Sequence, residues 1–327
     1  MRGGRIGRVA VYGAAIGVMA FGILEALCRA GAVPNSTYRV ARACRPGDAA
    51  RRVLILGDSF AFDFDGSYGR LLAGDLRGRG ADVVNLAIPG SGPLDYREQL
   101  ERCAASFKPT VVVVNYYVGN DASDTSAALG RRAGIRGSVR RVVRSTYFGA
   151  LILDTQARWL ESRRLRAIGN REAEVDAAVN PFLIEAGREY PDLIADNLLL
   201  ESPAMALAWE ANRLALHDIA RLTRDSGGGL LVVICPSSLQ VNDSHRQFYA
   251  NLGFRLERRV FESDRPQRLL TGVCAQEHVA CLDLLLSFRD RRSEELYVAN
   301  DDHWNSRGQA LAFADVRQAL QSLGWIP

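Results

Sequence analysis

Lysine and histidine are scarce in this sequence. Lys108 is the single lysine among 41 basic residues, and the 327-residue chain has four histidines. The net charge of +4 at pH 7 is therefore carried by arginine, without the clustered basic and aromatic side chains that mark nucleic-acid-binding surfaces. The densest arginine run, at 131–144, fits one face of a helix and indicates a solvated or membrane-facing surface. We expect no nucleic-acid partner.

Motifs that bind metals or nucleotides are also missing. None of the six cysteines stands in a C-x-x-C pair, and no Cys/His set has the spacing of a zinc site. No G-x-G-x-x-G follows the first predicted strand, and there is no P-loop lysine. The sequence therefore predicts neither a metal nor a cofactor. Cys274 and Cys281 flank a short polar segment, which fits either a small disulfide loop or two separate buried thiols.

The N-terminus has the pattern of a targeting segment. Three arginines precede the uncharged stretch 9–24, and Glu25 interrupts an apolar run that then continues. This pattern predicts that 1–33 is an uncleaved signal anchor or a cleaved signal peptide. Because arginines before an apolar segment stay inside, we expect the rest of the chain outside a bacterial inner membrane, anchored with its catalytic domain in the periplasm, or secreted after cleavage.

The remaining chain alternates between two kinds of periodicity. Turn-forming residues at 34–50 indicate a linker before a domain at 51–327. Strands are predicted at 53–56, 83–88, 111–117, 230–235 and 281–286, and helices at 68–79, 94–107, 205–225 and 306–323. Residues 122–203 show no strand pattern and are predicted as a helical insertion. Insertions at such positions often form lids over a site. The alternation predicts an α/β fold, a parallel sheet between two layers of helices.

A serine follows the first predicted strand. The apolar run 53–56 leads into Gly57-Asp58-Ser59, and Gly57 permits a sharp bend where the strand ends. Open α/β folds place their chemistry at the carboxyl edge of the sheet, so Ser59 is a candidate nucleophile. A strand followed by a Gly-Asp-Ser turn is also common without any catalytic role, so other groups at this edge must support the assignment.

A serine nucleophile needs a base, and the histidines can be compared one by one. They are His217, His245, His278 and His303. The first lies in the middle of a predicted helix, the second in a variable region after a strand, and the third at the opposite end of the sheet. His303 follows the last strand, at the same edge as Ser59. Either Asp301 or Asp302 before it can accept a hydrogen bond from its Nδ1.

Acyl transfer also needs hydrogen-bond donors for the oxyanion. The backbone N–H groups of Ser59 and Gly90 and the side-chain amide of Asn120 follow three strands whose carboxyl ends share one edge. Taken singly, Gly90 and Asn120 are also ordinary turn residues. Together they predict an oxyanion hole.

Four short blocks resemble the SGNH (GDSL-like) hydrolase superfamily. They are Gly57-Asp58-Ser59-Phe60, 85–90 with Gly90, Gly119-Asn120-Asp121, and Asp301-Asp302-His303-Trp304-Asn305, in the order of the family. The resemblance implies a three-layer α/β/α sandwich, flavodoxin-like, with sheet order 2-1-3-4-5. It also implies Ser59 as nucleophile, His303 as base, and Gly90 and Asn120 in the oxyanion hole.

Two positions depart from the common pattern of that family. Phe60 stands where many members have Leu, and the last block has Asp301-x-His303 instead of Asp-x-x-His. The latter resembles the Asp-x-His-Trp variant of membrane-anchored or periplasmic members tied to polysaccharide O-acetylation. Asp301 is therefore the expected triad acid, with Asp302 as the alternative.

The predicted function is that of a serine esterase or O-acyltransferase with a Ser-His-Asp triad. Its partner would be an acyl ester, such as the O-acetyl ester of a polysaccharide or a lipid of the cell envelope. The alternative is a non-catalytic carbohydrate-binding or assembly protein on the same fold, but binding alone does not require a nucleophile and a base.

Overall fold

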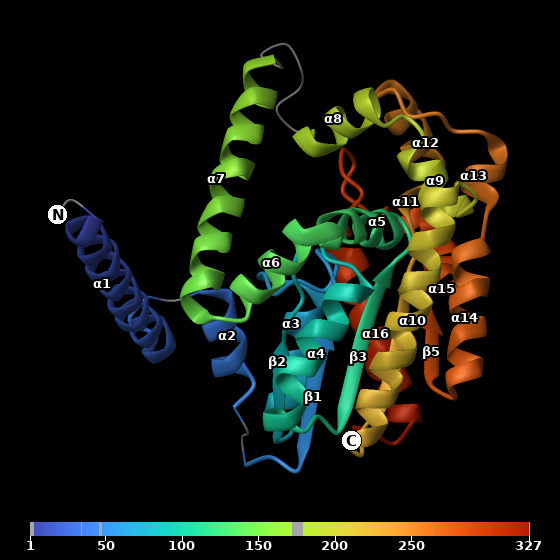
Figure 1. The fold of residues 1–327 in the computed structure, drawn as a ribbon. Coiled ribbons are helices and arrows are strands. Elements are labelled where there is room, and N and C mark those ends of the chain that lie inside the picture. The colour runs from blue at the N-terminus through green and yellow to red at the C-terminus, as the bar shows by residue number, and fades with distance from the viewer. Residues whose placement is uncertain (1–2, 34, 46–47, 172–178, 327) are drawn as a thin grey trace. The chain divides into compact units, whose positions relative to one another are not determined.

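The structure is a computed structural model that describes residues 3–33, 35–45, 48–171 and 179–326 (Figure 1). Pro34, Pro46 and Gly47 of the predicted linker, and residues 172–178 of the predicted insertion, lie outside the described residues. The chain divides into two compact units, Met1–Ala43 with Arg132–Ala167, and Cys44–Arg131 with Ile168–Pro327. The predicted boundaries at 33, 50, 122 and 203 stay predictions.

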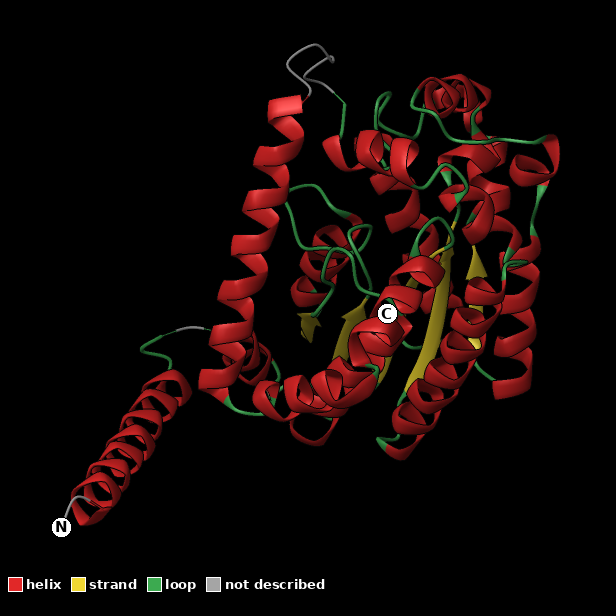
Figure 2. Cartoon of the chain, turned by 45° about the horizontal axis from the view of Figure 1, so that its top comes forward, coloured by secondary structure: helices red, strands yellow, loops and turns green. Residues whose placement is uncertain are grey.

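The second unit contains a parallel sheet between helices (Figure 2). Its strands are β1 Arg51–Leu56, β2 Ala81–Asn85, β3 Val111–Tyr117, β4 Gly229–Cys235 and β5 Ala280–Asp283. The sheet order is β2-β1-β3-β4-β5 and every pairing is parallel, with Val53 opposite both Val83 and Val111. The predicted α/β fold and its strand order are confirmed. Because the strands are parallel, all their carboxyl ends lie at one edge.

The described residues contain sixteen α-helices. They are α1 Gly3–Ala30, α2 Ser36–Ala43, α3 Tyr68–Gly78, α4 Pro93–Phe107, α5 Asp121–Arg132, α6 Gly134–Arg144, α7 Tyr147–Arg171, α8 Pro181–Glu189, α9 Leu193–Leu199, α10 Pro203–Asp225, α11 Ser238–Val241, α12 Asp243–Asn251, α13 Arg258–Glu262, α14 Arg265–Glu277, α15 Leu285–Asp290 and α16 Ser306–Ser322. Helices α5 to α9 occupy the segment between β3 and α10 that was predicted to be helical.

Side chains of the central strands alternate between the two faces of the sheet. On one face, Val53, Ile55, Val111 and Val113 form a core with residues of α3 and α16. On the other face, α4 packs against β1, and α10 packs against α4 and β4. All seven residues of β3 are buried, as expected for a strand covered on both faces.

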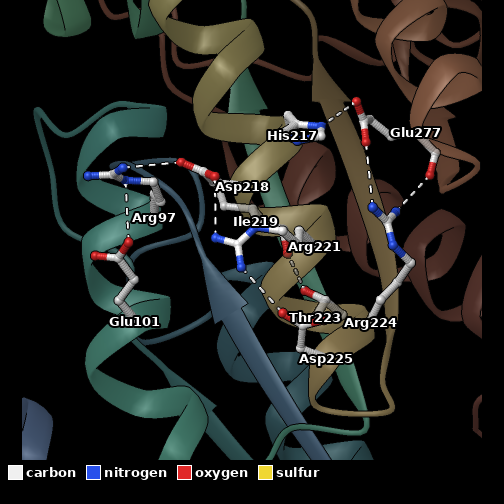
Figure 3. A network of polar contacts seen from close by, with 10 residues as sticks. All are labelled: Arg97, Glu101, His217, Asp218, Ile219, Arg221, Thr223, Arg224, Asp225 and Glu277. Carbon is white, nitrogen blue, oxygen red and sulfur yellow. Dashed lines mark hydrogen bonds and ion pairs between the residues drawn. The ribbon is translucent and has the colours of Figure 1, made fainter.

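Charged side chains join the outer surfaces of α4, α10 and α14 (Figure 3). Arg97 on α4 pairs with Asp218 on α10 at 3.1 Å, and His217 on α10 contacts Glu277 on α14 at 2.9 Å. Solvated pairs of this kind contribute about 0–1 kcal/mol each. This layer is therefore held mainly by the apolar residues that α10 buries, such as Leu216 and Ile219.

Two predicted strands end earlier than expected. The last strand was predicted to reach residue 286, but Asp283 Oδ1 accepts a hydrogen bond from Leu285 N at 2.9 Å, where α15 begins. In the second, Asn85 Oδ1 accepts from Ala87 N at 2.9 Å. Single backbone bonds to the neighbouring strand continue past both ends, from Leu284 N to Ile234 O at 3.1 Å and from Leu86 N to Ile55 O at 2.9 Å. The regular strands nevertheless stop where these local side-chain bonds turn the chain.

A disulfide joins Cys44 to Cys103 on α4, a pairing that the sequence analysis missed. The cysteines are 59 residues apart, and no local spacing marks them as partners. Cys274 and Cys281 are free thiols whose Sγ atoms lie 2.7 Å apart. They are therefore neighbours that no disulfide joins in the structure.

The first unit contains α1, α2, α6 and most of α7. Within the described residues, Tyr12–Ala30 of α1 is a stretch long and apolar enough to cross a membrane, a test that a signal sequence also passes. The predicted linker is partly helical, since α2 begins at Ser36. The backbone N–H and the hydroxyl of Ser36 donate to the carboxylate of Asp154 on α7 at 2.8 and 3.0 Å, which stabilises the start of α2.

Candidate active site

Ser59 and His303 meet at the carboxyl edge of the sheet. The distance from Ser59 Oγ to His303 Nε2 is 2.8 Å, although the two residues are 244 positions apart. Ser59 lies three residues after the end of β1. The sequence prediction that these two residues share one edge therefore agrees with the geometry.

Gly57 allows Ser59 to sit against the sheet. A Cβ at position 57 would lie 2.8 Å from the Cβ atoms of both Ala61 and Asn115, closer than side-chain carbons approach. Asn115 is fixed in turn, because its Oδ1 accepts a hydrogen bond from the Tyr68 hydroxyl at 2.8 Å. This turn therefore requires glycine for its close approach to β3.

A short loop holds His303 in place. Tyr297 and Trp304 form an isolated antiparallel bridge, and Val298 N donates to His303 O at 2.9 Å. Asn305 then caps α16, since its Oδ1 accepts from Arg307 N at 2.9 Å. The imidazole is thus fixed by a closed backbone turn on one side and a capped helix on the other.

Two carboxylates face His303 Nδ1. Asp301 Oδ1 lies 2.9 Å away and Asp302 Oδ1 lies 3.2 Å away. The Tyr117 hydroxyl donates to the second oxygen of Asp302 at 3.2 Å. With the proton on Nδ1, the ring donates to the carboxylates and Nε2 accepts the hydroxyl proton of Ser59. The two aspartates are alternatives from the sequence, and the structure places both within reach of Nδ1.

The carboxylates govern the protonation of His303. Burial disfavours the imidazolium, but the hydrogen bonds to Asp301 and Asp302 outweigh burial and raise the pKa of His303 above its usual value. Burial acts to raise the pKa of Asp301, yet its hydrogen bond with His303 prevails and lowers it. Burial prevails at Asp302 and raises its pKa. Asp301 is therefore the more readily ionised partner of the histidine.

Aromatic rings enclose the histidine. The Phe60 ring stacks on His303 with centroids 5.1 Å apart and on Tyr117 at 3.9 Å, and it meets Trp304 edge-on at 4.9 Å. Phe60 is buried. The departure from Leu at this position therefore supplies a flat wall that restricts rotation of the imidazole.

Asp58 is a buried acid beside the serine, and the sequence analysis gave it no role. Its Oδ1 accepts a hydrogen bond from Phe60 N at 3.0 Å, while its Oδ2 has no hydrogen-bond partner among the described residues. Burial raises the pKa of Asp58 to about 7. Only its position next to Ser59 could have drawn attention to it.

Gly90 and Asn120 lie on the strand ends that flank Ser59, because β2 and β3 are the neighbours of β1. Gly90 is exposed with φ +68°, and the loop before it is tied to the serine turn, since Ile88 N donates to Gly57 O at 2.9 Å. These placements suit oxyanion donors, and that role stays a prediction.

The other histidines lie in different settings. His217 belongs to the exposed ion-pair network of α10 (Figure 3). His278 caps the C-terminus of α14. His245 is buried beside the Tyr297 ring, 5.9 Å between centroids. None of these three has a recorded bond to Ser59 among the described residues.

One group of side chains in the described residues has the ligand spacing of a metal site. The ligand atoms of Asp301, Asp302 and His303 lie within 4.8 Å of one another. Both ring nitrogens of His303 already engage protein groups, Nδ1 the carboxylates and Nε2 the Ser59 hydroxyl. The arrangement fits a base that accepts the serine proton at Nε2, while the carboxylates at Nδ1 orient the ring and stabilise its charge.

Comparison with known proteins gives structural similarities only. No family model and no curated protein matches the sequence. Among solved structures, TesA is 15% identical, with a TM-score of 0.41, over 84% of this chain and 99% of its own. The acetyl xylan esterase AlAXEase is 12% identical, with a TM-score of 0.44, over 82% of this chain and 99% of its own. Esterase EstA from Pseudoalteromonas sp. is 11% identical, with a TM-score of 0.40, over 84% of this chain and 98% of its own.

Proposed function

We propose that this chain is a serine esterase of the SGNH type, with Ser59 as nucleophile, His303 as base and Asp301 as the principal triad acid. The observation that supports it most is the continuous contact from Ser59 Oγ to Nε2 at 2.8 Å and from Nδ1 to Asp301 at 2.9 Å. A weakly nucleophilic hydroxyl needs such an adjacent, oriented base.

The reaction would proceed in two halves. In the first, His303 takes the Ser59 proton while Oγ attacks the ester carbonyl carbon. The tetrahedral intermediate collapses to an acyl-serine, and the departing alcohol receives the proton from His303. In the second, His303 deprotonates a water molecule that attacks the acyl carbon, and Ser59 recovers its proton as the acid leaves.

The negative oxygen of the tetrahedral intermediate needs donors. The backbone N–H groups of Ser59 and Gly90 and the amide of Asn120 would supply them, from the ends of three adjacent strands. Removing one such donor typically costs about 10²–10³ in kcat. Asn120→Ala should therefore lower kcat much more than it changes KM.

The substrate class follows from the sequence resemblance and the N-terminal segment. Both favour an acyl ester, such as an O-acetyl group, on a cell-envelope glycan or lipid outside the inner membrane. The Cys44–Cys103 disulfide supports an oxidising compartment. A sugar hydroxyl in place of water would make the same acyl-serine an intermediate of transfer.

Active-site labelling tests the proposal. A fluorophosphonate probe should label the wild-type protein at Ser59, and the Ser59→Ala variant should neither label nor hydrolyse p-nitrophenyl acetate. Ser322→Ala, at the exposed end of α16, is the matched control and should behave as wild type. Wild-type turnover by Ser59→Ala would refute the nucleophile assignment. Absence of labelling in the folded wild type would favour the non-catalytic carbohydrate-binding alternative.

Transfer and hydrolysis can be separated once labelling succeeds. Mass spectrometry would follow the acyl-serine after addition of water alone or of a soluble glycan. Faster loss of the acyl group with the appearance of acylated glycan would show transfer, and loss at the same rate in both would show hydrolysis.

A further inference from the structure

Helix α6 has an apolar face that is open to solvent. The exposed fractions of Ile135, Val139 and Val142 are 84%, 55% and 70%. Their spacing of four and three residues places them in one row along the helix. Three neighbouring apolar side chains this exposed mark a contact surface for something outside the domain.

The rest of the helix surface is basic. Arg136, Arg140 and Arg144 follow one another at intervals of four, next to the apolar row. The sequence contains no acidic residue between Asp124 and Asp154. A helix with a narrow apolar face and an arginine-rich remainder is typical of segments that lie in the surface of a bilayer.

Contacts within the same compact unit place α6 close to the end of α1. Glu25 on α1 accepts hydrogen bonds from the backbone N–H groups of Tyr147 and Phe148 at 3.1 and 2.7 Å, which caps the start of α7. The rings of Phe21 and Phe148 also meet edge-on, with centroids 5.7 Å apart. The beginning of α7 is thereby fixed to the last turns of α1.

The chain connection then limits where α6 can lie. Arg144 is three residues before Tyr147, which allows at most about 11 Å of extended chain. Charged groups in a spanning helix are tolerated near the surface of the bilayer, and Glu25 pairs with Arg29 in the last turns of α1. If α1 spans a membrane, the C-terminal end of α6 therefore lies near its surface.

We propose that α6 lies in the surface of an anionic phospholipid bilayer, with its apolar row among the acyl chains and its arginines at the level of the phosphates. Charge complementarity favours lipid over a second copy of the chain, which would bring arginines of the same sign together. The contact would hold the domain close to the membrane and would weaken with salt.

Hydrogen–deuterium exchange of the full-length protein in lipid nanodiscs tests this contact. Discs of phosphatidylcholine would be compared with discs that also contain phosphatidylglycerol. We expect amides of 135–144 to exchange at least about tenfold more slowly with the anionic lipid, because opening must first release the helix from the bilayer. Added salt should remove the difference, while peptides of α16 should not change.

Two variants separate the apolar and the basic contributions. Val139→Glu should restore fast exchange in the anionic discs, and so should replacement of Arg136, Arg140 and Arg144 by glutamine. Leu214→Glu on α10, where Leu214 is 50% exposed, is the matched control and should keep the protection. Arg136, Val139 and Leu214 are exposed, and Arg140 and Arg144 are half-buried. None lies in the core, so the fold should tolerate these substitutions.

Several results would overturn the proposal. Equal exchange in the two kinds of disc would do so, as would protection that survives Val139→Glu. Failure of the chain to enter either disc would remove the anchor on which the geometry depends. Protection in detergent that increases with protein concentration would instead assign the apolar row to contact between copies.

Discussion

Asp301 and Asp302 should both contribute to orienting the imidazole ring of His303. Nδ1 lies 2.9 Å from Asp301 and 3.2 Å from Asp302, so removal of one charge leaves the other within hydrogen-bond range. With a single acid, amide replacement lowers kcat by about 10⁴. One charge-assisted hydrogen bond is worth about 1.5–3 kcal/mol, or roughly 10–150-fold in rate. We therefore expect losses of roughly 10–150-fold for Asp301→Asn and for Asp302→Asn, and about 10⁴ for the double variant.

The pH profile of kcat/KM independently tests whether both carboxylates act on His303. The base must be neutral to accept the serine proton, and both carboxylates raise the pKa of His303. The acid limb of kcat/KM for the wild type should therefore lie above the usual value of 6.5. Each single variant loses part of this effect, so its acid limb should move to lower pH even though its maximum rate falls.

The assay is hydrolysis of p-nitrophenyl acetate over a range of pH, corrected for the spontaneous reaction. Asp290→Asn, at an exposed position, is the control and should match the wild type in rate and profile. If Asp301→Asn shows the whole loss while Asp302→Asn leaves rate and profile unchanged, Asp302 takes no part and the joint role of the two carboxylates is refuted.

Three further substitutions test the surroundings of Ser59. Gly57→Ala would place a Cβ 2.8 Å from Ala61; such overpacking costs about 1–3 kcal/mol, so Tm and kcat should both fall. Phe60→Leu removes the ring stacked on His303, and kcat/KM should fall by roughly threefold to tenfold. Because the ring is buried, its loss leaves a cavity, and Tm should also fall. Asp58→Asn removes a carboxyl whose folded-state pKa of about 7 exceeds its unfolded value of 3.8. As the pH rises from 3.8 to about 7, the free energy of unfolding of the wild type should therefore fall by up to about 4 kcal/mol relative to this variant, as measured by urea unfolding.

The sheet was predictable because its strands carry their own signal. The run at 111–117 is nearly all apolar and buried on both faces, as expected for a strand between two helical layers. Once the strands are parallel, their carboxyl ends converge whatever the packing details. The proximity of Ser59 and His303 follows from that convergence, which is why residues so far apart in the chain could be paired from the sequence.

Features that depend on side-chain packing were not predictable. The pairing of Cys44 with Cys103 depends on where α4 packs against the sheet, and periodicity does not specify that position. The same applies to Phe60, whose stacking on His303 requires the loop after β5 to fold back over the turn after β1. The local sequence specifies which helices and strands form, and the packing of these elements places the Phe60 ring against His303.

The sequence alone leaves open which of the two aspartates faces His303. In an extended strand, adjacent side chains point to opposite sides, so only one of the two could face the imidazole. The loop before His303 is a turn, in which Asp301 N donates to Val298 O at 3.2 Å, so both carboxylates can approach one nitrogen. Asp301 Oδ1 also accepts from Asp302 N at 2.7 Å. Asp301 thus holds the loop as well as the ring. An asparagine keeps that acceptor and removes only the charge, whereas an alanine removes both, so the amide variant alone reports on the electrostatic part of its role.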